Sequence, residues 1–418
     1  MNADLFIAGI SQLATATGTG AKYGAQMRDV SIMENAAIAI SGGQFTWTGR
    51  ATEWRGTASS TIDLGGRAVI PGLIDPHTHA VWAGDRLQDF DARISGVTYE
   101  EILAAGGGIW RTIRATAAAS DDLLVSLTEQ HIWALIHSGA TVVEVKSGYG
   151  FTVAAELRLL EVIGVVASRL PIRVIPTLLI HIPPSNPKER EAYVEQVCSE
   201  LIPETARRGL ATVVDVFVEK EAWSTTQAAS MLTCALEHGL RVKLHAEQFH
   251  SVGGVELGLH LNALSIDHLE ACKSQQYALF RNSSTIATVL PGVSLHLGIP
   301  RAPGRALIDA GAAVAVGTDL NPGSSPLFSI SAALGLAVRL NGLTSDEALI
   351  AGTVNAACAL GFDDAGRIEA GAQADFAVLE SPDWRDLIYT MGANPIREVW
   401  CRGRRIAGSA GRKENHDA

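Results

Sequence analysis

The sequence contains little cysteine and no arrangement of cysteines that is typical of a disulfide framework. The chain of 418 residues has five cysteines, an odd number, and no two of them form a CxxC pair. Small secreted domains depend on many paired cysteines, whereas free thiols persist in a reducing compartment. The cysteines therefore favour a cytoplasmic protein and argue against a scaffold that disulfides hold together.

The sequence also lacks the long apolar runs that membrane insertion and secretion require. Its first residues, MNADLFIAGISQLATATG, do not place a basic segment ahead of an apolar core. No apolar run approaches the roughly 18–20 residues that span a bilayer. We therefore expect a cytoplasmic location and no membrane partner.

Positive charge is in the minority. The chain has 33 Lys and Arg residues against 44 Asp and Glu residues, which gives a formal net charge of −11. A protein that binds nucleic acid needs Lys and Arg clustered against the phosphates, and no basic stripe is present. The charge balance argues against a nucleic-acid partner. An anionic small molecule remains a possible substrate, and an individual Arg or Lys would have to bind it.

Apolar residues are plentiful, at 47% of the chain, and they follow a regular pattern. Eight short apolar runs recur, most of them separated by helix-like segments such as Asp121–His137 and Thr226–His238. Apolar strands that alternate with helices predict an α/β fold with a parallel sheet covered on both faces. Eight units favour a closed (β/α)₈ barrel of the TIM type, although the pattern does not exclude an open sheet. The runs are Ala68–Ile74, Thr141–Lys146, Arg173–Leu179, Val213–Val218, Arg241–His245, Ala263–Asp267, Thr285–Leu290 and Ala312–Gly317.

The two ends of the chain have a different pattern. Ala37–Ser41 and Gln44–Gly49 flank a Gly-Gly pair, which predicts a hairpin, and the short runs Asp375–Leu379 and Arg397–Ile406 predict further strands. Neither end is large enough to fold alone, so we expect them to pair in one small β-sandwich domain. The predicted organisation is a composite β domain of residues 1–65 and 366–410, a barrel of residues 66–365, and a tail of residues 411–418.

The strongest motif follows the first predicted strand, where His77 and His79 lie two residues apart. Alternate residues of an extended segment point to the same side, so both imidazoles can bind one metal ion. Two polar loop residues are the plainer interpretation. His245, His268 and Asp319 lie at the ends of later predicted strands, and the carboxyl ends of barrel strands meet at one face. Three imidazoles and one carboxylate suit Zn²⁺ or Fe²⁺.

These positions resemble the pattern of the amidohydrolase superfamily, in which HxH on strand one joins His on strands five and six and Asp on strand eight. Within it, the chain is similar to the imidazolonepropionase family from about residue 30 to residue 405. The GGGI and KSGYG motifs in the matching segments are more specific than HxH. The segments are Pro71–Arg86, Tyr99–Arg114 (YEEILAAGGGIWRTIR), Glu144–Gly150 (EVKSGYG), Lys243–Gln248 (KLHAEQ), Asp267–Glu270 (DHLE) and Thr318–Ser324 (TDLNPGS).

The resemblance implies a role for each matching residue. The implied ligands of one divalent ion, Zn or Fe, are His77, His79, His245 and Asp319. The residues implied around the substrate are Arg86, Tyr149, His181, Gln248, Asn321, Gly323 and Ser324. The planar guanidinium of Arg86 suits a carboxylate, although a surface salt bridge would also explain it. Tyr149 could stack on a ring or simply pack, and a lone histidine such as His181 is often structural.

The activity that the resemblance implies is hydrolysis of the ring amide of 4-imidazolone-5-propanoate to N-formimidoyl-L-glutamate in histidine degradation. Asp319 is expected to carry a proton from water to the departing ring nitrogen. His268 is expected to hydrogen-bond the carbonyl oxygen, and Gln248 to position the ring. Many superfamily members carry a carboxylated lysine between two metals on strand four, whereas Lys146, which is followed by Ser-Gly-Tyr as in imidazolonepropionases, is expected to remain unmodified.

Other interpretations remain open at this point. A metal-dependent aminohydrolase that deaminates a purine-like ring would place a glutamate near His245, and Glu247 and Gln248 both lie there. A non-catalytic scaffold would have lost metal ligands. Two segments, Leu178–Pro184 and Leu290–Gly298, depart from the family's usual sequence at the expected edge of the pocket. The sequence does not choose between Zn and Fe, and an exposed barrel face would allow a homodimer.

Overall fold

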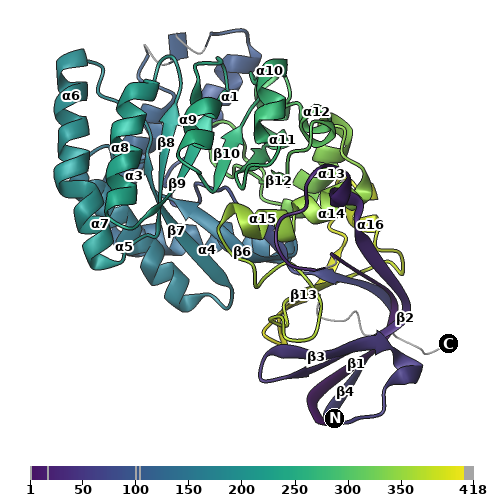
Figure 1. Cartoon of the computed structure of the whole chain (residues 1–418). Helices are drawn as coiled ribbons and strands as arrows, with labels where there is room; N and C mark the ends of the chain where they lie inside the picture. The colour runs from purple at the N-terminus through teal and green to yellow at the C-terminus, as the bar shows by residue number, and fades with distance from the viewer. Residues whose placement is uncertain (1, 17, 99–100, 103–104, 409–418) are drawn as a thin grey trace.

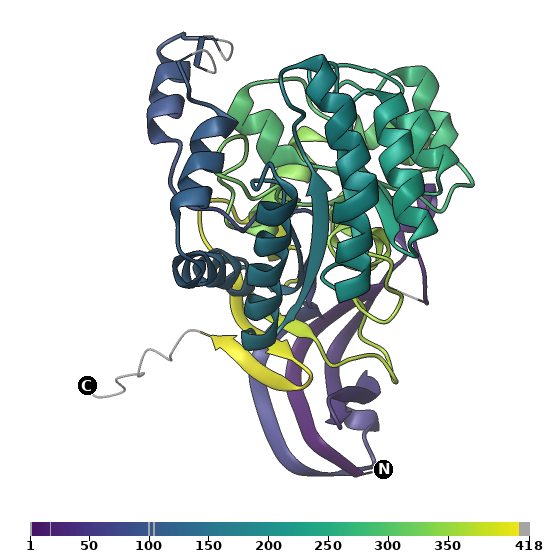
Figure 2. The ribbon, with the colours of Figure 1, turned by 90° about the vertical axis from the view of Figure 1, so that its left-hand side faces the viewer.

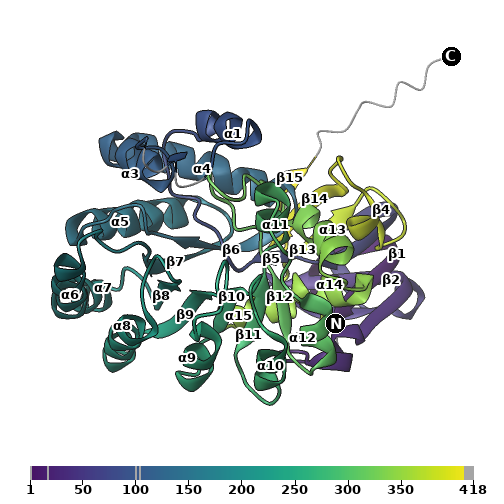
Figure 3. The same cartoon turned by 90° about the horizontal axis from the view of Figure 1, so that it is seen from above.

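The middle of the chain forms a nearly closed barrel of eight parallel strands surrounded by helices (Figure 1, Figure 3). The computed structural model describes residues 2–16, 18–98, 101–102 and 105–408. Each barrel strand pairs with the next one along the chain. The predicted fold class is confirmed. The strands are β5 (Leu73–Asp75), β6 (Ala140–Lys146), β7 (Arg173–Ile180), β8 (Val213–Val218), β9 (Arg241–Ala246), β10 (Ser265–His268), β11 (Ile286–Val289) and β12 (Val314–Val316).

The helices cover the outer face of the barrel, and several begin at a serine or threonine that caps the first turn (Figure 3). Ser120 accepts a hydrogen bond from Leu123 N, and Ser224 accepts one from Gln227 N, which satisfies amides that have no partner within the helix. The α-helices are α1 (Leu87–Ile94), α3 (Ile109–Ala118), α4 (Asp121–His137), α5 (Val153–Arg169), α6 (Pro187–Gln196), α7 (Ile202–Arg208), α8 (Thr225–Glu237), α9 (Gly254–His260), α10 (Ser274–Tyr277), α11 (Pro291–Leu297), α12 (Gly304–Asp309), α13 (Ile330–Leu340), α14 (Ser345–Ala351), α15 (Val354–Ala359) and α16 (Asp386–Tyr389).

The first predicted barrel strand, Ala68–Ile74, was wrong in its bounds. Residues up to Pro71 belong to β4 (Thr57–Pro71) of a second sheet, and the barrel strand begins only at Leu73. Gly72 separates the two strands, and its N–H donates to Asp375 O, 3.0 Å away. A Cβ at Gly72 would lie 2.3 Å from Thr141 Oγ1, so only glycine allows this close approach to β6. One continuous apolar run therefore serves two sheets.

The strands at the two chain ends form a second, seven-stranded sheet in the order β15-β14-β13-β4-β1-β2-β3. Gly42 and Gly43 link β2 to β3 with positive φ angles of 58° and 78°, as a tight hairpin requires. The predicted tail, residues 411–418, lies outside the described residues. The strands, besides β4, are β1 (Asn2–Ala16), β2 (Val30–Ser41), β3 (Gln44–Arg50), β13 (Phe376–Leu379), β14 (Ile396–Cys401) and β15 (Arg404–Gly408).

This sheet curls on itself and encloses a core of its own. Three strands separate β3 from β13, so in a flat sheet these two would be about 19 Å apart. The rings of Phe45 on β3 and Phe376 on β13 are nevertheless 6.1 Å apart, and Trp400 stacks on Phe376 at 5.2 Å. The curled sheet has the sandwich form that was predicted, and it lies below the barrel in Figure 2.

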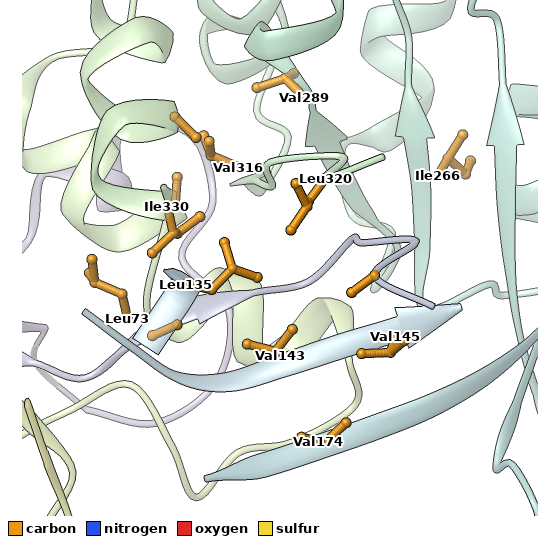
Figure 4. Packing of buried hydrophobic residues seen from close by; sticks show 14 of the residues in the cluster. Leu73, Leu135, Val143, Val145, Val174, Ile266, Val289, Val316, Leu320 and Ile330 are labelled. Carbon is orange, nitrogen blue, oxygen red and sulfur yellow. The ribbon is translucent and has the colours of Figure 1, made fainter. Parts of the chain in front are cut away.

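The main hydrophobic core joins the barrel strands to the helices around them (Figure 4). The same buried cluster includes Ala14 and Ile70 from the terminal sheet, so this sheet packs directly against the barrel. No helix within the described part of the chain is long and apolar enough to cross a lipid bilayer. Side chains from both layers that Figure 4 labels include Leu73, Val143 and Val316 of the strands with Leu135 and Ile330 of the helices.

The barrel closes between its last and first strands, at the level where the predicted metal ligands lie. Asp319 N donates to His77 O at 3.0 Å, and His79 N donates to Leu320 O at 2.9 Å. Thr318 adds two hydrogen bonds to the Asp75 carboxylate, from its N–H at 3.1 Å and from its hydroxyl at 2.6 Å. The segments that close the barrel are therefore also those that carry the predicted ligands.

Candidate metal centre and substrate pocket

His77 and His79 project from the extended segment that follows β5. Lys146 N donates to Thr78 O at 2.9 Å, and the Thr78 hydroxyl donates to Glu144 O at 2.5 Å, so Thr78 is held against β6. Side chains alternate along an extended segment, so the two imidazoles share the opposite side. Their rings lie 5.3 Å apart. The two imidazoles thus lie on the same side of the segment, as the HxH spacing predicts.

Four buried side-chain atoms converge at this end of the barrel. His79 Nε2 lies 3.3 Å from His245 Nε2 and 3.1 Å from Asp319 Oδ1, and His77 Nε2 lies 3.3 Å from the same oxygen. His77 Nε2 and Asp319 Oδ1 have no hydrogen-bond partner among the described residues. Ligand atoms around a tetrahedral ion are separated by roughly 3.3–3.4 Å. The donor set and its spacing fit one divalent ion.

The protonation of the imidazoles also suits metal binding, which requires a free lone pair. Burial lowers the pKa of His79, and burial and neighbouring positive groups hold the pKa of His245 well below its ordinary value. His77 differs, because the Asp267 carboxylate lies 2.7 Å from its Nδ1. Burial lowers the pKa of His77, but Asp267 and Asp319 outweigh it and the pKa is raised. A proton on Nδ1, shared with Asp267, leaves Nε2 for the ion.

The loop after β12 holds Asp319 in place. Asn321 Nδ2 donates to Asp319 Oδ2 at 2.9 Å, and the Ser324 hydroxyl donates to the same oxygen at 3.2 Å. Asn321 Oδ1 in turn accepts the N–H groups of Gly323 at 2.8 Å and Ser324 at 2.7 Å. Asp319 Oδ1 therefore remains free to face the histidines. Asp319 itself has a positive φ of 51°, a strained conformation that is frequent at functional sites.

Arg86, predicted to bind a substrate carboxylate, lies beside this loop. A Cβ on Gly323 would be 3.1 Å from Arg86 Nη1, so glycine keeps the space beside the guanidinium open. Arg86 Nε is hydrogen-bonded to Asp89, whose carboxylate also accepts Gly108 N at 3.0 Å. The pairing is a salt bridge, but a largely buried one, with 11% of the Arg86 side chain exposed. The Gly-rich motif is thus tied to Arg86 through Asp89. Of the matching segment Tyr99–Arg114, residues 99–100 and 103–104 lie outside the described residues.

Tyr149 and His181 lie at the edge of the histidine cluster. The His181 ring stacks on His79 at 5.7 Å, and the Tyr149 ring lies 6.0 Å from His181. Burial and the nearby His79 lower the pKa of His181 to about 3, so its ring is neutral. Glu156 fixes the loop that carries Tyr149 by accepting the N–H groups of Gly148 and Gly150, both at 2.7 Å. Sequence reasoning missed Glu156, although an acidic residue in the first turn after a Gly-rich loop was a usable signal.

Gln248 and Glu247, next to each other after β9, have different environments. The Gln248 side chain makes no hydrogen bond among the residues that the structure describes, and the residue is 7% exposed. The Glu247 carboxylate instead accepts backbone N–H groups of the following loop, from Val252 at 3.0 Å and Gly254 at 2.9 Å among others. Glu247 therefore caps the start of α9. Its carboxylate is not available beside His245.

His268 ends β10 next to the proposed ligands. Its ring lies 5.6 Å from His77 and 5.2 Å from His245. One of its nitrogens lies within 4.8 Å of a ligand atom of both His77 and Asp319. Of the two segments with unusual sequences, the second forms α11, and His296 there stacks on Phe90 at 5.5 Å. His296 is not part of the histidine cluster.

Beneath the histidines lies a buried group of two lysines and three carboxylates. Lys146 Nζ is 2.7 Å from both Glu144 and Asp215, and Lys243 Nζ is 2.9 Å from Glu144. All of these side chains are 0% exposed. Burial would lower the pKa of Lys146, but the carboxylates outweigh it and raise that pKa. The group reaches two proposed ligands, because Asp267 contacts His77 and Asp215 lies 3.0 Å from His245 Nδ1.

Comparison with known proteins agrees with this site. The amidohydrolase family model matches residues 68–406, which include every proposed ligand. The barrel and the site define the class of protein, and the chain belongs to the amidohydrolase family. That family and the His/Asp cluster indicate a divalent metal ion.

Its curated relatives narrow the family further. The imidazolonepropionase of Deinococcus deserti is 57% identical over 407 residues, which cover 97% of this chain and 100% of that protein. The imidazolonepropionase of Deinococcus radiodurans is 56% identical over 95% of this chain and 98% of its own length, and that of Rubrobacter xylanophilus is 40% identical over 94% and 96%. The chain is therefore a member of the imidazolonepropionase family.

Solved structures support the fold alone, because their sequences are distant. A zinc-bound adenosine deaminase from Xanthomonas campestris has a TM-score of 0.69 and 19% identity, with 97% of this chain and 93% of that chain covered. Guanine deaminase of E. coli has a TM-score of 0.68 and 16% identity, covering 97% and 99%. The architecture is thus shared by enzymes with different substrates, and the choice of substrate depends on the residues of the pocket.

Proposed function

We propose that this chain hydrolyses the ring amide bond of 4-imidazolone-5-propanoate and releases N-formimidoyl-L-glutamate, a step of histidine degradation. The observation that carries the proposal is the convergence of His77, His79, His245 and Asp319 beside the loop of Gly323, against which Arg86 lies. A cation beside a metal centre suits a substrate with both a hydrolysable ring and a carboxylate tail. Relatives with up to 57% identity bear the name of this activity.

The residues divide the chemistry among them. The four ligands would hold one ion, Zn²⁺ or Fe²⁺, which when bound lowers the pKa of water toward about 7. Asp319 takes the proton of the attacking water and delivers it to the departing ring nitrogen. The Ser324 hydroxyl has a second acceptor, Asn321 Oδ1 at 3.2 Å, so it can turn away from Asp319 Oδ2 when that oxygen takes the proton. His268 donates to the carbonyl oxygen as negative charge develops there.

The remaining pocket residues hold the substrate. Arg86 binds the propionate, Tyr149 and His181 enclose the ring, and Gln248 donates to or accepts from a ring nitrogen. Gln248 is suited to this role because its amide has no partner within the described chain. We assign this chemistry to the barrel proposed for residues 66–365, whose first strand begins at Leu73. The β domain proposed for residues 1–65 and 366–410 supports it and also includes residues 66–71 at the end of β4.

The state of Lys146 supports a single ion. Carboxylation of a lysine requires a neutral amine, whose lone pair attacks carbon dioxide. Lys146 Nζ lies 2.7 Å from two carboxylates, and the raised pKa keeps it an ammonium group without a lone pair. A carbamate on Lys146 is therefore disfavoured, and Lys146 also ends β6, the second barrel strand, rather than the fourth strand, β8.

The alternative of a purine-like ring deaminase lacks support from the pocket. Such an enzyme would need a carboxylate beside the strand-five histidine as a proton shuttle. Next to His245, Glu247 is occupied by the backbone of residues 252–255, and Gln248 is an amide. A neutral purine-like ring would also offer no carboxylate for the Arg86 guanidinium to bind. These residues favour the imidazolone.

The experiment that tests the proposal is an assay of the purified, metal-analysed protein with 4-imidazolone-5-propanoate. We expect the ultraviolet absorbance of the ring to disappear and N-formimidoyl-L-glutamate to form, above the rate of spontaneous decay. A chelator should abolish turnover, and one equivalent of Zn²⁺ or Fe²⁺ should restore it. A protein that holds one ion per chain and still shows no turnover would overturn the substrate assignment.

Removal of the Arg86 guanidinium should weaken substrate binding. We expect Arg86→Gln to lower kcat/KM by about 10- to 100-fold, mainly through KM, because a charge-assisted hydrogen bond contributes about 1.5–3 kcal/mol. Arg111→Gln is the matched control, since Arg111 Nε is 3.4 Å from the same Asp89 carboxylate. Steady-state kinetics of both variants would decide. An equal loss of kcat/KM in Arg86→Gln and Arg111→Gln would mean that Arg86 only holds Asp89 in place and does not bind the substrate.

A further inference from the structure

Glu270, two residues after the end of β10, is a buried carboxylate without an ordinary partner. Its side chain is 1% exposed, and neither of its oxygens accepts a hydrogen bond from any described residue. Among the described residues, the basic side chain within 4 Å of this carboxylate is His268, whose Nδ1 lies 3.4 Å from Glu270 Oε2. That nitrogen is also buried and has no hydrogen-bond partner within the described chain. Two unsatisfied polar groups of complementary type thus face each other.

Two buried polar groups without partners destabilise the folded protein unless they bind each other. A buried carboxylate that lacks hydrogen bonds loses the solvation of its charge. The backbone adds strain, since both His268 and Leu269 have positive φ angles, of 88° and 70°. Residues other than glycine are strained in this conformation, and they tend to persist in it where a site requires it. The buried carboxylate without hydrogen bonds and the strained backbone thus occur together, where Glu270 lies beside His268.

We infer that Glu270 is a positioning residue that accepts a hydrogen bond from His268 Nδ1–H and so orients the imidazole toward the substrate. A small rotation would shorten the 3.4 Å separation to hydrogen-bond length. With Nδ1–H donated to Glu270, Nε2 at the opposite edge of the ring is left for the carbonyl oxygen, and it donates to that oxygen when it carries a proton as well. The carboxylate also stabilises the ring when both nitrogens carry protons. The role in turnover rests on the proposed function of His268.

The kinetic test is a double-mutant cycle. We expect Glu270→Gln to lower kcat by about 10- to 100-fold, as loss of an orienting partner typically does, with KM within about threefold and the bound metal unchanged. In a His268→Gln background, the same substitution should have almost no further effect, because it acts through His268. Glu270→Asp, which keeps the charge, should retain more activity than Glu270→Gln. Additive losses would overturn the inference.

Glu347→Gln is the matched control for removal of a buried glutamate. Glu347, on α14, forms salt bridges with Arg28 and Arg305, and its side chain is 0% exposed. We expect this variant to lose stability while its kcat stays within about twofold of the parent. If kcat of Glu347→Gln fell as much as kcat of Glu270→Gln, the effect of Glu270→Gln would be explained by general destabilisation, and the positioning role would be overturned.

A second measurement does not depend on turnover. In zinc-loaded protein labelled with ¹⁵N-histidine, we expect a downfield Nδ1–H proton signal that disappears in both His268→Gln and Glu270→Gln. Absence of this signal from the parent protein would overturn the hydrogen bond. If the parent shows the signal but does not hydrolyse the imidazolone, the proposed function fails while the pairing stands.

Discussion

Asp319→Asn is expected to lower kcat for 4-imidazolone-5-propanoate by about 10³-fold, within the range that loss of a general base produces. The substitution keeps the shape of the side chain, and its amide oxygen can still accept from Asn321 Nδ2, now 2.9 Å from Asp319 Oδ2. It removes the negative charge at Oδ1, which lies 3.1 and 3.3 Å from Nε2 of His79 and His77. Metal affinity should therefore fall as well. Initial rates at saturating metal and metal analysis by mass spectrometry would measure the two effects separately.

Asp122→Asn is the control for this experiment. Asp122 lies in the first turn of α4, where it is exposed, and it should leave both kcat and metal content unchanged. The assignment of Asp319 would be contradicted if Asp319→Asn kept more than about a tenth of the parent kcat with its metal bound. The proton would then have to be carried by another group, and His268 would be the first candidate.

The side chains of the histidine cluster could be predicted to lie together because a parallel barrel brings the carboxyl ends of its strands to one face. His77, His245, His268 and Asp319 are far apart in the chain, but each follows or ends an apolar run that reads as a strand. The structure places all four within one cluster. Pocket residues on loops, such as Arg86 and His181, could be named only through the family resemblance, because nothing in their spacing indicates a common site.

What sequence could not give is the set of contacts that support those residues. The Asp267 carboxylate contacts His77, which is 190 residues away in the sequence, and Lys243 contacts Glu144, which is 99 residues away. A charged residue inside an apolar strand indicates that a partner exists but not which one. The division between β4 and β5 was missed, although the Pro71-Gly72 dipeptide inside the run is a turn signal at the place where the two strands separate.

Lys146→Met is expected to lower the free energy of unfolding by about 3–5 kcal/mol, the usual effect of removing one partner from a buried ion pair. Lys146 contacts Glu144 and Asp215, each at 2.7 Å. Glu144 keeps Lys243 at 2.9 Å, so Asp215 is the carboxylate left without a lysine. Total stabilities are about 5–15 kcal/mol, so this loss would be a large fraction of the whole. Urea unfolding of the metal-free protein, followed by circular dichroism, would measure it.

Two further variants determine whether the cause is electrostatic. Lys146→Met combined with Asp215→Asn should recover much of the loss, because it removes the charge that the single variant leaves unpaired. Lys188→Met, at an exposed position on α6, should change stability by no more than about 0.5 kcal/mol. Any Lys146 variant that folds should still bind one metal ion per chain after reconstitution. A parent with two ions and a variant with fewer would instead mean that Lys146 serves as a metal-bridging group, which its two buried carboxylate partners argue against.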